Sequence, residues 1–186
     1  MDINELYEIL LSEKPSTGII LNEDRIFAMI PELEECKGFN QNSVWHIYDV
    51  YNHILKVVDN VPCNLPLRLA ALFHDAGKPK RYTEDERGGH FYGHWEESRK
   101  IFYRFAEENR LNVNLELLVS KLILHHDINL EKMTDEGIKH LLEIFSKEEL
   151  EMLFELKKAD LLAQNSEYHY LLDTYENQKQ KLMKKY

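Results

Sequence analysis

Residues 69–79 read Leu-Ala-Ala-Leu-Phe-His-Asp-Ala-Gly-Lys-Pro, an apolar segment that ends in two ionisable residues just before a glycine. The apolar run predicts a helix over 65–76, and the glycine and proline predict that it ends there. Two charges at the end of an apolar helix are costly unless something compensates them. His74 and Asp75 can do this by coordinating one divalent cation. For the dipeptide alone, a histidine near a helix end beside a solvated aspartate is the more common arrangement.

The rest of the sequence predicts an all-α protein. Seven glycines and five prolines are few for 186 residues, and the helical period recurs almost everywhere between them. The expected helices span 2–12, 22–30, 43–59, 65–76, 93–110, 114–127, 134–144, 146–164 and 166–184. Ser43 is expected to cap the third of these, and Ser146 with Glu149 matches a capping box. The last helix is expected to be a solvated tail or to pack on a partner.

Residues 78–93 are expected to form a long surface loop. They contain Pro79, two adjacent glycines and a run of charged residues. Loops of that length in a compact domain are often functional, so this one is a candidate part of the site.

Composition restricts the class of protein. The net charge is -10, which disfavours tight binding to a long nucleic acid but leaves a small phosphorylated substrate possible. Cys36 and Cys63 have no paired spacing, which fits free thiols in a reducing cytoplasm. The acidic N-terminus does not resemble a signal peptide, and no apolar run is long enough to span a membrane. A cytoplasmic protein is expected, and its oligomeric state cannot be predicted.

A polar stripe is predicted on the helix expected from Ser43. His46, Asp49 and His53 are spaced i, i+3 and i+7, which places them on one face among apolar neighbours. The stripe is therefore expected to face a cavity. The alternative is a surface pair of Asp49 and His53, worth a few tenths of a kcal/mol.

Other helices add ionisable residues on apolar faces. Asp160 follows leucines at helical spacing and is expected to be buried, either as a metal ligand or in a structural hydrogen bond or salt bridge to an arginine. His126 continues an apolar face, whereas His125 points about a quarter-turn away. His94 opens a helix directly after the long loop. At each histidine, the alternative is a buried structural histidine or a surface one. Because five expected helices each place a histidine or an aspartate on an inward face, we favour a shared metal site.

These residues resemble the HD-domain metal-dependent phosphohydrolases, whose pattern is a histidine, a His-Asp pair and a distant aspartate. The matching residues are His53, His74, Asp75 and Asp160. The sequence also resembles more specifically the HD region of bacterial CCA-adding tRNA nucleotidyltransferases, through residues 30–33, 41–46, 49–50, 53, 68–79 and 93–94. We expect no nucleotidyltransferase head. The resemblance implies a single HD domain over 1–186, with an N-terminal helical segment (1–42), a metal-binding core (43–164) and a C-terminal helix (165–186).

The resemblance also implies roles for the site residues. The first histidine, the His-Asp pair and the last aspartate would hold one metal, and Asp75 would bridge to a second. His94 and His126 are in the matching places for the second ion, with His125 competing for one ligand position.

The expected reaction is attack of a metal-activated water on phosphorus. Asp75, Lys78 and Asp49 are the expected catalytic residues, with Asp49 orienting an imidazole or reaching the metal. Lys78, Arg81 and Arg99 are candidates to bind the substrate phosphate, although each could be an ordinary surface cation. Iron, manganese, nickel, cobalt, zinc or magnesium would suit the ligands, as one ion or two.

The expected substrate is a small phosphoester, such as a nucleotide monoester or a 2',3'-cyclic diester. The alternatives are a non-enzymatic nucleotide- or tRNA-binding module and an HD-type di-iron oxygenase.

Overall fold

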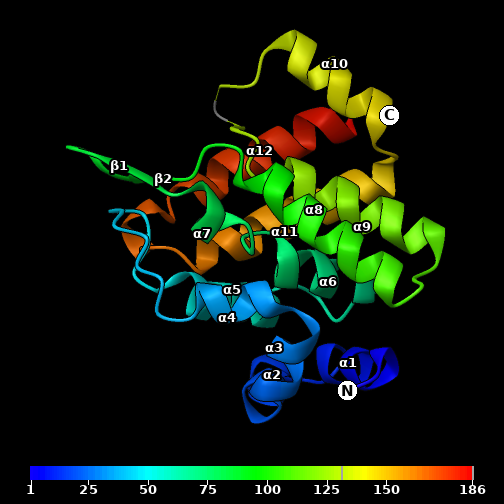
Figure 1. Cartoon of the computed structure of the whole chain (residues 1–186). Coiled ribbons are helices and arrows are strands. Elements are labelled where there is room, and N and C mark those ends of the chain that lie inside the picture. Colours follow the sequence, from blue (N-terminus) through cyan, green and yellow to red (C-terminus); the bar gives the residue numbers. More distant parts are fainter. Residues whose placement is uncertain (131, 186) are drawn as a thin grey trace.

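The computed structural model describes residues 1–130 and 132–185, and it confirms the all-α prediction (Figure 1). The N-terminal helices are α1 (Ile3–Leu10), α2 (Pro15–Leu21), α3 (Glu23–Met29) and α4 (Pro31–Cys36). The middle of the chain forms α5 (Val50–Asn60), α6 (Leu65–Phe73), α7 (Lys78–Arg81), β1 (Thr83–Asp85), β2 (Gly88–His90), α8 (His94–Glu108) and α9 (Val113–His125). The C-terminal part forms α10 (Asp135–Ile144), α11 (Lys147–Leu162), a 3-10 turn (Ser166–Tyr168) and α12 (Leu171–Met183).

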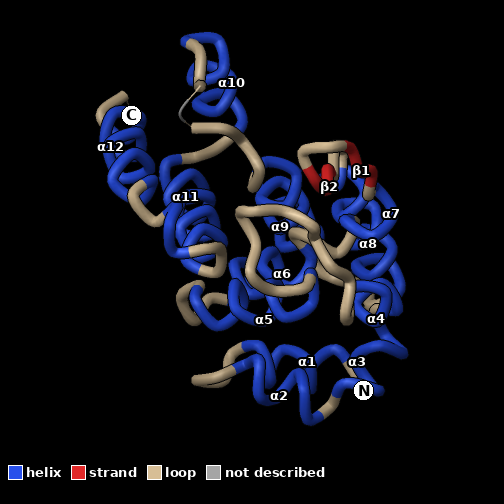
Figure 2. Tube along the Cα trace, turned by 90° about the vertical axis from the view of Figure 1, so that its left-hand side faces the viewer, coloured by secondary structure: helices blue, strands red, loops and turns tan. Residues whose placement is uncertain are grey.

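Helix α6 is the centre of the bundle. Every residue from Leu67 to Phe73 is buried, and α5, α8, α9 and α11 all pack on this helix. Helices α1–α3 lie together at one end of the molecule and α10 at the other, as two perpendicular views show (Figures 1 and 2). The carboxyl end of α6, where His74 and Asp75 follow, is therefore surrounded by other helices. None of the helices in residues 1–130 and 132–185 combines the length and apolarity that a membrane span requires.

The capping prediction is confirmed at one helix and wrong at another. Ser146 and Glu149 form the predicted capping box at the start of α11. The helix expected from Ser43 instead begins at Val50, because the Asp49 carboxylate accepts a hydrogen bond from the backbone N–H of Asn52 at 2.8 Å. Asp49 is therefore the N-cap of α5, and residues 37–49, which connect α4 to α5, are not helical.

The predicted long loop over 78–93 is also wrong, because these residues form α7 and an antiparallel pair of short strands. The two glycines allow β2 to lie directly against the segment before α5. A Cβ atom on Gly89 would lie 2.3 Å from the carbonyl oxygen of Gln41, and the φ of Gly88 is +111°. Glycines that suggested a loop are thus required for close packing of a hairpin.

Besides α7, two further helices were not predicted, and the C-terminal helix differs in detail from its prediction. Helices α2 and α4 begin with Pro15 and Pro31, in the first turn, where proline leaves no hydrogen bond unmade. The C-terminal helix begins at Leu171 rather than at 166 and packs along α11, with Leu171 and Leu182 buried. Its apolar face is therefore covered by this chain.

Candidate metal centre

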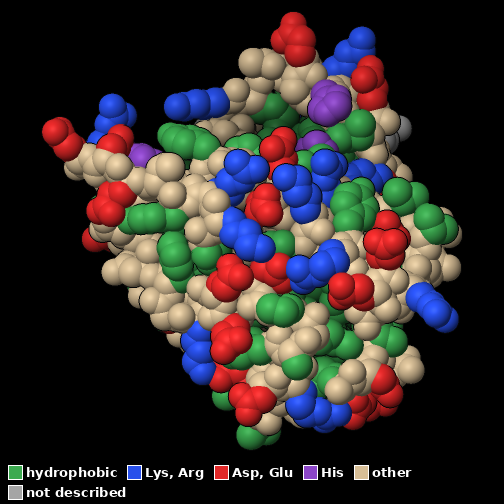
Figure 3. Space-filling view, viewed as in Figure 1, with side chains coloured by type: hydrophobic (Ala, Val, Ile, Leu, Met, Phe, Trp, Pro, Cys, Tyr) green, Lys and Arg blue, Asp and Glu red, His purple; other side chains and the backbone are tan. Residues whose placement is uncertain are grey.

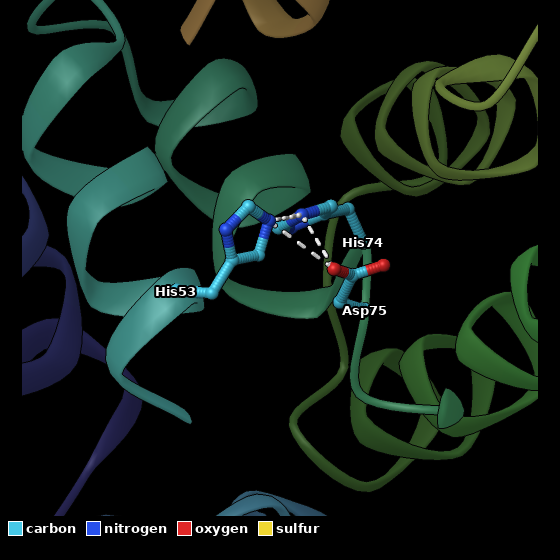
Figure 4. A group of neighbouring side chains, drawn as sticks. All are labelled: His53, His74 and Asp75. Atoms are coloured by element: carbon cyan, nitrogen blue, oxygen red, sulfur yellow. Dashed lines mark hydrogen bonds and ion pairs between the residues drawn. The ribbon is translucent and has the colours of Figure 1, made fainter. Parts of the chain in front are cut away.

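Asp75 is the centre of a buried cluster of histidines. The residue follows α6 and is 2% exposed. Its Oδ2 atom lies 3.3 Å from Nε2 of His53 and 3.2 Å from Nε2 of His74 (Figure 4). Its Oδ1 atom lies 3.1 Å from Nε2 of His94 and 3.6 Å from Nε2 of His126. One carboxylate therefore faces two separate pairs of imidazoles.

We call the first group site A. The ligand atoms of His53, His74 and Asp75 lie within 4.8 Å of one another. His53 comes from α5 and His74 ends α6, and both rings point toward Asp75 (Figure 4). Asp160, from α11, adds a second carboxylate, with its Oδ1 atom 3.0 Å from Nε2 of His53.

The second group, site B, consists of Asp75, His94 and His126. Their ligand atoms also lie within 4.8 Å of one another. His94 is the first residue of α8 and His126 directly follows α9, so two helix ends deliver these side chains. The Nε2 atoms of the two histidines are 3.1 Å apart.

Three imidazoles are held by their other ring nitrogen. Nδ1 of His74 lies 2.8 Å from the carbonyl oxygen of Ala71. Nδ1 of His94 and Nδ1 of His126 make the corresponding contacts at 2.9 and 2.7 Å, with the carbonyls of the third residue before each. A carbonyl oxygen only accepts, so Nδ1 of each ring donates to it and Nε2 is directed toward the cluster.

This arrangement fits a cation. Carboxylate oxygens and Nε2 lone pairs are all acceptors, and acceptors about 3 Å apart repel one another unless a positive charge lies between them. Imidazole and carboxylate are ordinary ligands for divalent metals, and a backbone carbonyl on the far nitrogen is the usual support of a ligating histidine. The residues present therefore fit a divalent metal at both sites.

The close packing of buried histidines and carboxylates also shifts the pKa values of the cluster residues. Burial disfavours the charge on His53, but hydrogen bonds with Asp160 and Asp75 outweigh it and raise the pKa of His53 to about 9. Burial would raise the pKa of Asp75, yet the surrounding histidines and Lys78 hold that pKa well below its usual range. The pKa of His126 is lowered, chiefly by burial. Of these three groups, only His53 thus holds a proton more readily than an isolated side chain of its type.

Lys78 lies next to the cluster. Its buried ammonium donates to Oδ2 of Asp75 at 2.7 Å and to the side-chain carbonyl of Gln41 at 2.7 Å. The structure thus pairs Lys78 with the central carboxylate.

Asp49 and His46 are placed differently from the prediction. The expectation that Asp49 orients an imidazole needs correction, because its carboxylate accepts hydrogen bonds from the backbone N–H and the side-chain amide of Asn52. His46 precedes α5, so His46, Asp49 and His53 do not form one helical stripe. The His46 ring nevertheless packs edge-on against that of His53, with centroids 4.9 Å apart.

The structure distinguishes the two adjacent histidines, His125 and His126, by where their side chains lie. His126 lies in site B, whereas the ring of His125 packs against Phe145 at 5.4 Å and lies 6.1 Å from the ring of His140. Burial lowers the pKa of His125 to about 4. The structure brings only His126 of this pair to Asp75.

The two candidate phosphate-binding arginines lie outside the cluster. Arg81 pairs with Glu97 at 3.6 Å, and the guanidinium of Arg99 lies 5.8 Å from the ring centre of Tyr103. The face over α7 and α8 shows Lys and Arg side chains interspersed with acidic ones (Figure 3). Neither arginine lines the two cavities beside the cluster that the described residues form.

Two cavities flank the cluster. One, of about 300 Å³, reaches Asp160 and Lys157, and the other, of about 480 Å³, reaches His94 and Lys78. They share four lining residues, which are Trp45, His46, Asp127 and Asn129. The Trp45 ring stacks on Tyr168 with centroids 3.6 Å apart, so the C-terminal part of the chain supports this wall.

The sequence patterns did not single out Trp45 or Lys157, which line the cavities beside the cluster. A signal for Lys157 was present, because it lies seven residues after Leu150 and three before Asp160, on the same helical face. A lysine in an apolar stripe was the same kind of irregularity that identified Asp160. Trp45 lies in a non-helical segment, where periodicity gives no indication of direction.

The family model described as "HD domain" matches residues 46–166. The chain belongs to the HD domain family. This family is typical of metal-dependent phosphohydrolases, and its members bind divalent metals. The matched region begins at His46 and includes all the residues of sites A and B.

Two curated proteins are similar to part of the chain. The A-adding tRNA nucleotidyltransferase of Deinococcus radiodurans is 32% identical over 100 residues, which is 49% of this chain and 23% of that protein. The CC-adding tRNA nucleotidyltransferase of Thermus thermophilus is 34% identical over 106 residues, which is 52% of this chain and 24% of that protein. The similarity thus covers about a quarter of each relative and confirms the expected resemblance to this group.

Proposed function

We propose that this protein is a metal-dependent phosphohydrolase that acts on a small phosphoester, with a nucleotide as the preferred candidate. One observation carries the proposal: each oxygen of Asp75 faces its own pair of histidine Nε2 atoms. Two cations about one carboxylate form the arrangement that suits hydrolysis of phosphate esters. Asp160 adds a second carboxylate at site A.

Bound divalent cations would supply an acidic water and neutralise charge on the phosphoryl oxygens. His53, His74, Asp75 and Asp160 would hold one cation, and Asp75, His94 and His126 the other. The backbone carbonyls on Nδ1 of three of these histidines fix the ring orientation, so that little rearrangement is needed on binding.

The chain's other residues have distinct roles in this proposal. Lys78 orients the Asp75 carboxylate through its 2.7 Å contact and lies where it can approach a phosphoryl oxygen, since it also lines the larger cavity. Trp45 and His46 form the wall common to both cavities and would limit the size of the group attached to phosphorus. Asp49 and His125 are assigned no part in the proposed reaction, because their side chains contact Asn52 and Phe145 respectively.

The relatives' names suggest a role with tRNA, but their similarity covers only about a quarter of their length. Net charge also argues against it, because a surface of charge -10 repels a phosphate backbone. A small ester that enters the cavities avoids this repulsion.

A phosphoester panel tests the proposal. The purified chain is stripped of metal and reloaded with manganese, iron, cobalt, nickel, zinc or magnesium. Release of phosphate is then measured from nucleoside monophosphates and p-nitrophenyl phosphate, and opening of 2',3'-cyclic nucleotides to nucleoside monophosphates is followed by chromatography, with oxygen consumption recorded in parallel. We expect metal-dependent hydrolysis without oxygen uptake. Oxygen uptake without hydrolysis would instead indicate a di-iron oxygenase, and turnover that needs no metal would contradict the proposal.

A further inference from the structure

The smaller cavity contains a buried cation that the proposed reaction does not use. Lys157 lies on α11, one turn before Asp160, and is 6% exposed. Its ammonium donates a hydrogen bond to the carbonyl oxygen of His126 at 2.6 Å and lies 5.5 Å from the centre of the Tyr175 ring. In the described part of the chain, no carboxylate oxygen lies within 4.0 Å of this ammonium in a salt bridge.

A buried ammonium without a direct ion pair is costly. Burial lowers the pKa of Lys157, which reflects that cost, while the charges of Asp127 and Asp160 act in the opposite direction. These two aspartates line the same cavity as Lys157. The ammonium is thus compensated at a distance by carboxylates rather than by contact.

One of these carboxylates is committed to site A. Asp160 lies 3.0 Å from Nε2 of His53, so a cation at site A would take up its charge. The ammonium of Lys157 would then face the cavity with less compensation and with hydrogen-bond donors to spare, because the structure gives it a single carbonyl acceptor. Such a site favours an anion.

The position of Lys157 separates it from Lys78. Lys78 contacts Asp75 directly and lines the larger cavity, whereas Lys157 lies beside Asp160 in the smaller one. The ammonium groups of the two lysines therefore lie in different cavities beside the same cluster. Trp45 and Tyr175 provide apolar wall in the smaller cavity, so an organic group can extend from the cluster toward Lys157.

Resting on the function proposed above, we propose that Lys157 is a specificity-determining residue that binds a second anionic group of the substrate, distinct from the phosphoester held at Asp75. The preferred substrate is then an organic phosphoester that carries another phosphoryl or carboxylate group. A phosphoester with a single anionic group is bound less well, because the buried ammonium remains without an anionic partner.

The test compares two nucleotides that differ by one phosphoryl group. Initial rates of phosphate release from adenosine 3',5'-bisphosphate and adenosine 5'-monophosphate are measured with the metal-reloaded full chain. We expect a higher kcat/KM for the bisphosphate. In Lys157→Met this preference should fall about tenfold, which corresponds to about 1.4 kcal/mol, mainly through KM. A dicarboxylate monophosphate ester, assayed beside the bisphosphate, shows whether Lys157 prefers phosphoryl or carboxylate.

Lys158→Met is the matched control, since Lys158 is the next residue on α11 and is exposed. It should leave the preference unchanged. Lys157 also contacts the backbone of His126, so its replacement could disturb site B instead of removing a contact with the substrate. Measuring the metal content of the variant distinguishes these two effects. We expect Lys157→Met to retain both ions and to hydrolyse the monophosphate within about twofold of the original chain.

Three results would overturn the inference. The first is an unchanged preference in Lys157→Met, and the second is an equal loss of activity on both nucleotides together with loss of metal. The third is a bisphosphate that is no better a substrate than the monophosphate in the original chain. If neither nucleotide nor any other ester is hydrolysed, the proposed function fails as well. If esters are hydrolysed but one of these three results is found, only the role of Lys157 is contradicted.

Discussion

The Nε2 atoms of His94 and His126 lie 3.1 Å apart, and each ring is held through Nδ1 by the carbonyl oxygen of the third residue before it. Two imidazole lone pairs at this distance repel each other unless a proton or a metal cation lies between them, and the nearby Asp75 carboxylate favours such a positive charge. His125, one residue before His126, packs against Phe145 instead. The pair of adjacent histidines therefore provides a matched test of site B.

We expect His126→Ala to bind one metal ion where the original chain binds two, with phosphohydrolase activity reduced by roughly two orders of magnitude or more. His125→Ala should keep both ions and most of the activity. Elemental analysis of both variants checks this. Equal metal loss in the two variants, or loss only in His125→Ala, would contradict the assignment.

Metal should stabilise the fold through Asp75. A ligand that binds only the folded state at a hundred times its dissociation constant adds about 2.7 kcal/mol to the free energy of unfolding. Thermal unfolding of the original chain should therefore shift upward on addition of metal. We expect Asp75→Asn to lose this shift, because Asp75 belongs to both sites.

Asp24→Asn is the control for this experiment, since Asp24 is an exposed carboxylate on α3. It should keep the full metal-dependent shift. A shift of the same size in Asp75→Asn would mean that the metal binds elsewhere.

Much of this site could be predicted from sequence, because ionisable residues on apolar helical faces are visible in the periodicity. His74, Asp75 and Asp160 were identified in this way, and the structure brings all three toward His53. The segment before α5 could not be predicted, since Ser43 and Asp49 are both good N-caps and only tertiary packing chooses between them.

The close backbone contacts of the β2 glycines could not be predicted from the sequence either. Gly88 and Gly89 suggest a loop by composition, whereas their actual role depends on the backbone of residues 41–42, which no local pattern reveals. Lys157 shows a related limit. Its position on an apolar helical face could be seen in the sequence, but the cavity that it lines could not be predicted, because separate segments of the chain form it.

The turn after Asp75 should be sensitive to added volume. A Cβ on Gly77 would lie 2.6 Å from the backbone nitrogen of Ser98 and 2.7 Å from the carbonyl oxygen of His94. Because both contacts are with the backbone of α8, Gly77→Ala must displace the helix that carries His94. We expect a loss of about 1–3 kcal/mol in the free energy of unfolding, measured by urea denaturation, together with weaker metal binding at site B.

Gly137→Ala is the control for added volume, because the nearest atom to its Cβ would be the flexible Met133 side chain at 3.4 Å. It lies within α10, where alanine is favoured over glycine by roughly 0.5–1 kcal/mol. A Gly77→Ala variant as stable as Gly137→Ala would show that α8 does not pack as described.

A buried carboxylate far from the metal site should make stability depend on pH. Glu32 is 3% exposed and accepts two hydrogen bonds of 2.6 Å from Arg104, which outweigh burial and lower the pKa of Glu32 to about 2. Its stabilising contribution is therefore complete above the ordinary value of 4.5 and is lost as the pH falls toward about 2.

We expect Glu32→Gln to lower the free energy of unfolding at pH 7 by about 1–3 kcal/mol, limited by the partial exposure of Arg104. The difference from the original chain should narrow between pH 4.5 and pH 3, as followed by urea denaturation. Glu143→Gln, which breaks an exposed pair with Lys139, should change stability by less than about 0.5 kcal/mol at any of these pH values. A penalty for Glu32→Gln that is independent of pH would contradict the ion pair.

The most direct test of the metal centre is anomalous diffraction from crystals of the chain loaded with zinc. The account predicts two peaks, one on each side of Asp75. The first should lie about 2.0–2.2 Å from Nε2 of His53 and His74, and the second at a similar distance from Nε2 of His94 and His126. A single peak that contacts neither oxygen of Asp75, or no peak within the cluster at saturating metal, would contradict the central claim that this carboxylate joins two metal sites.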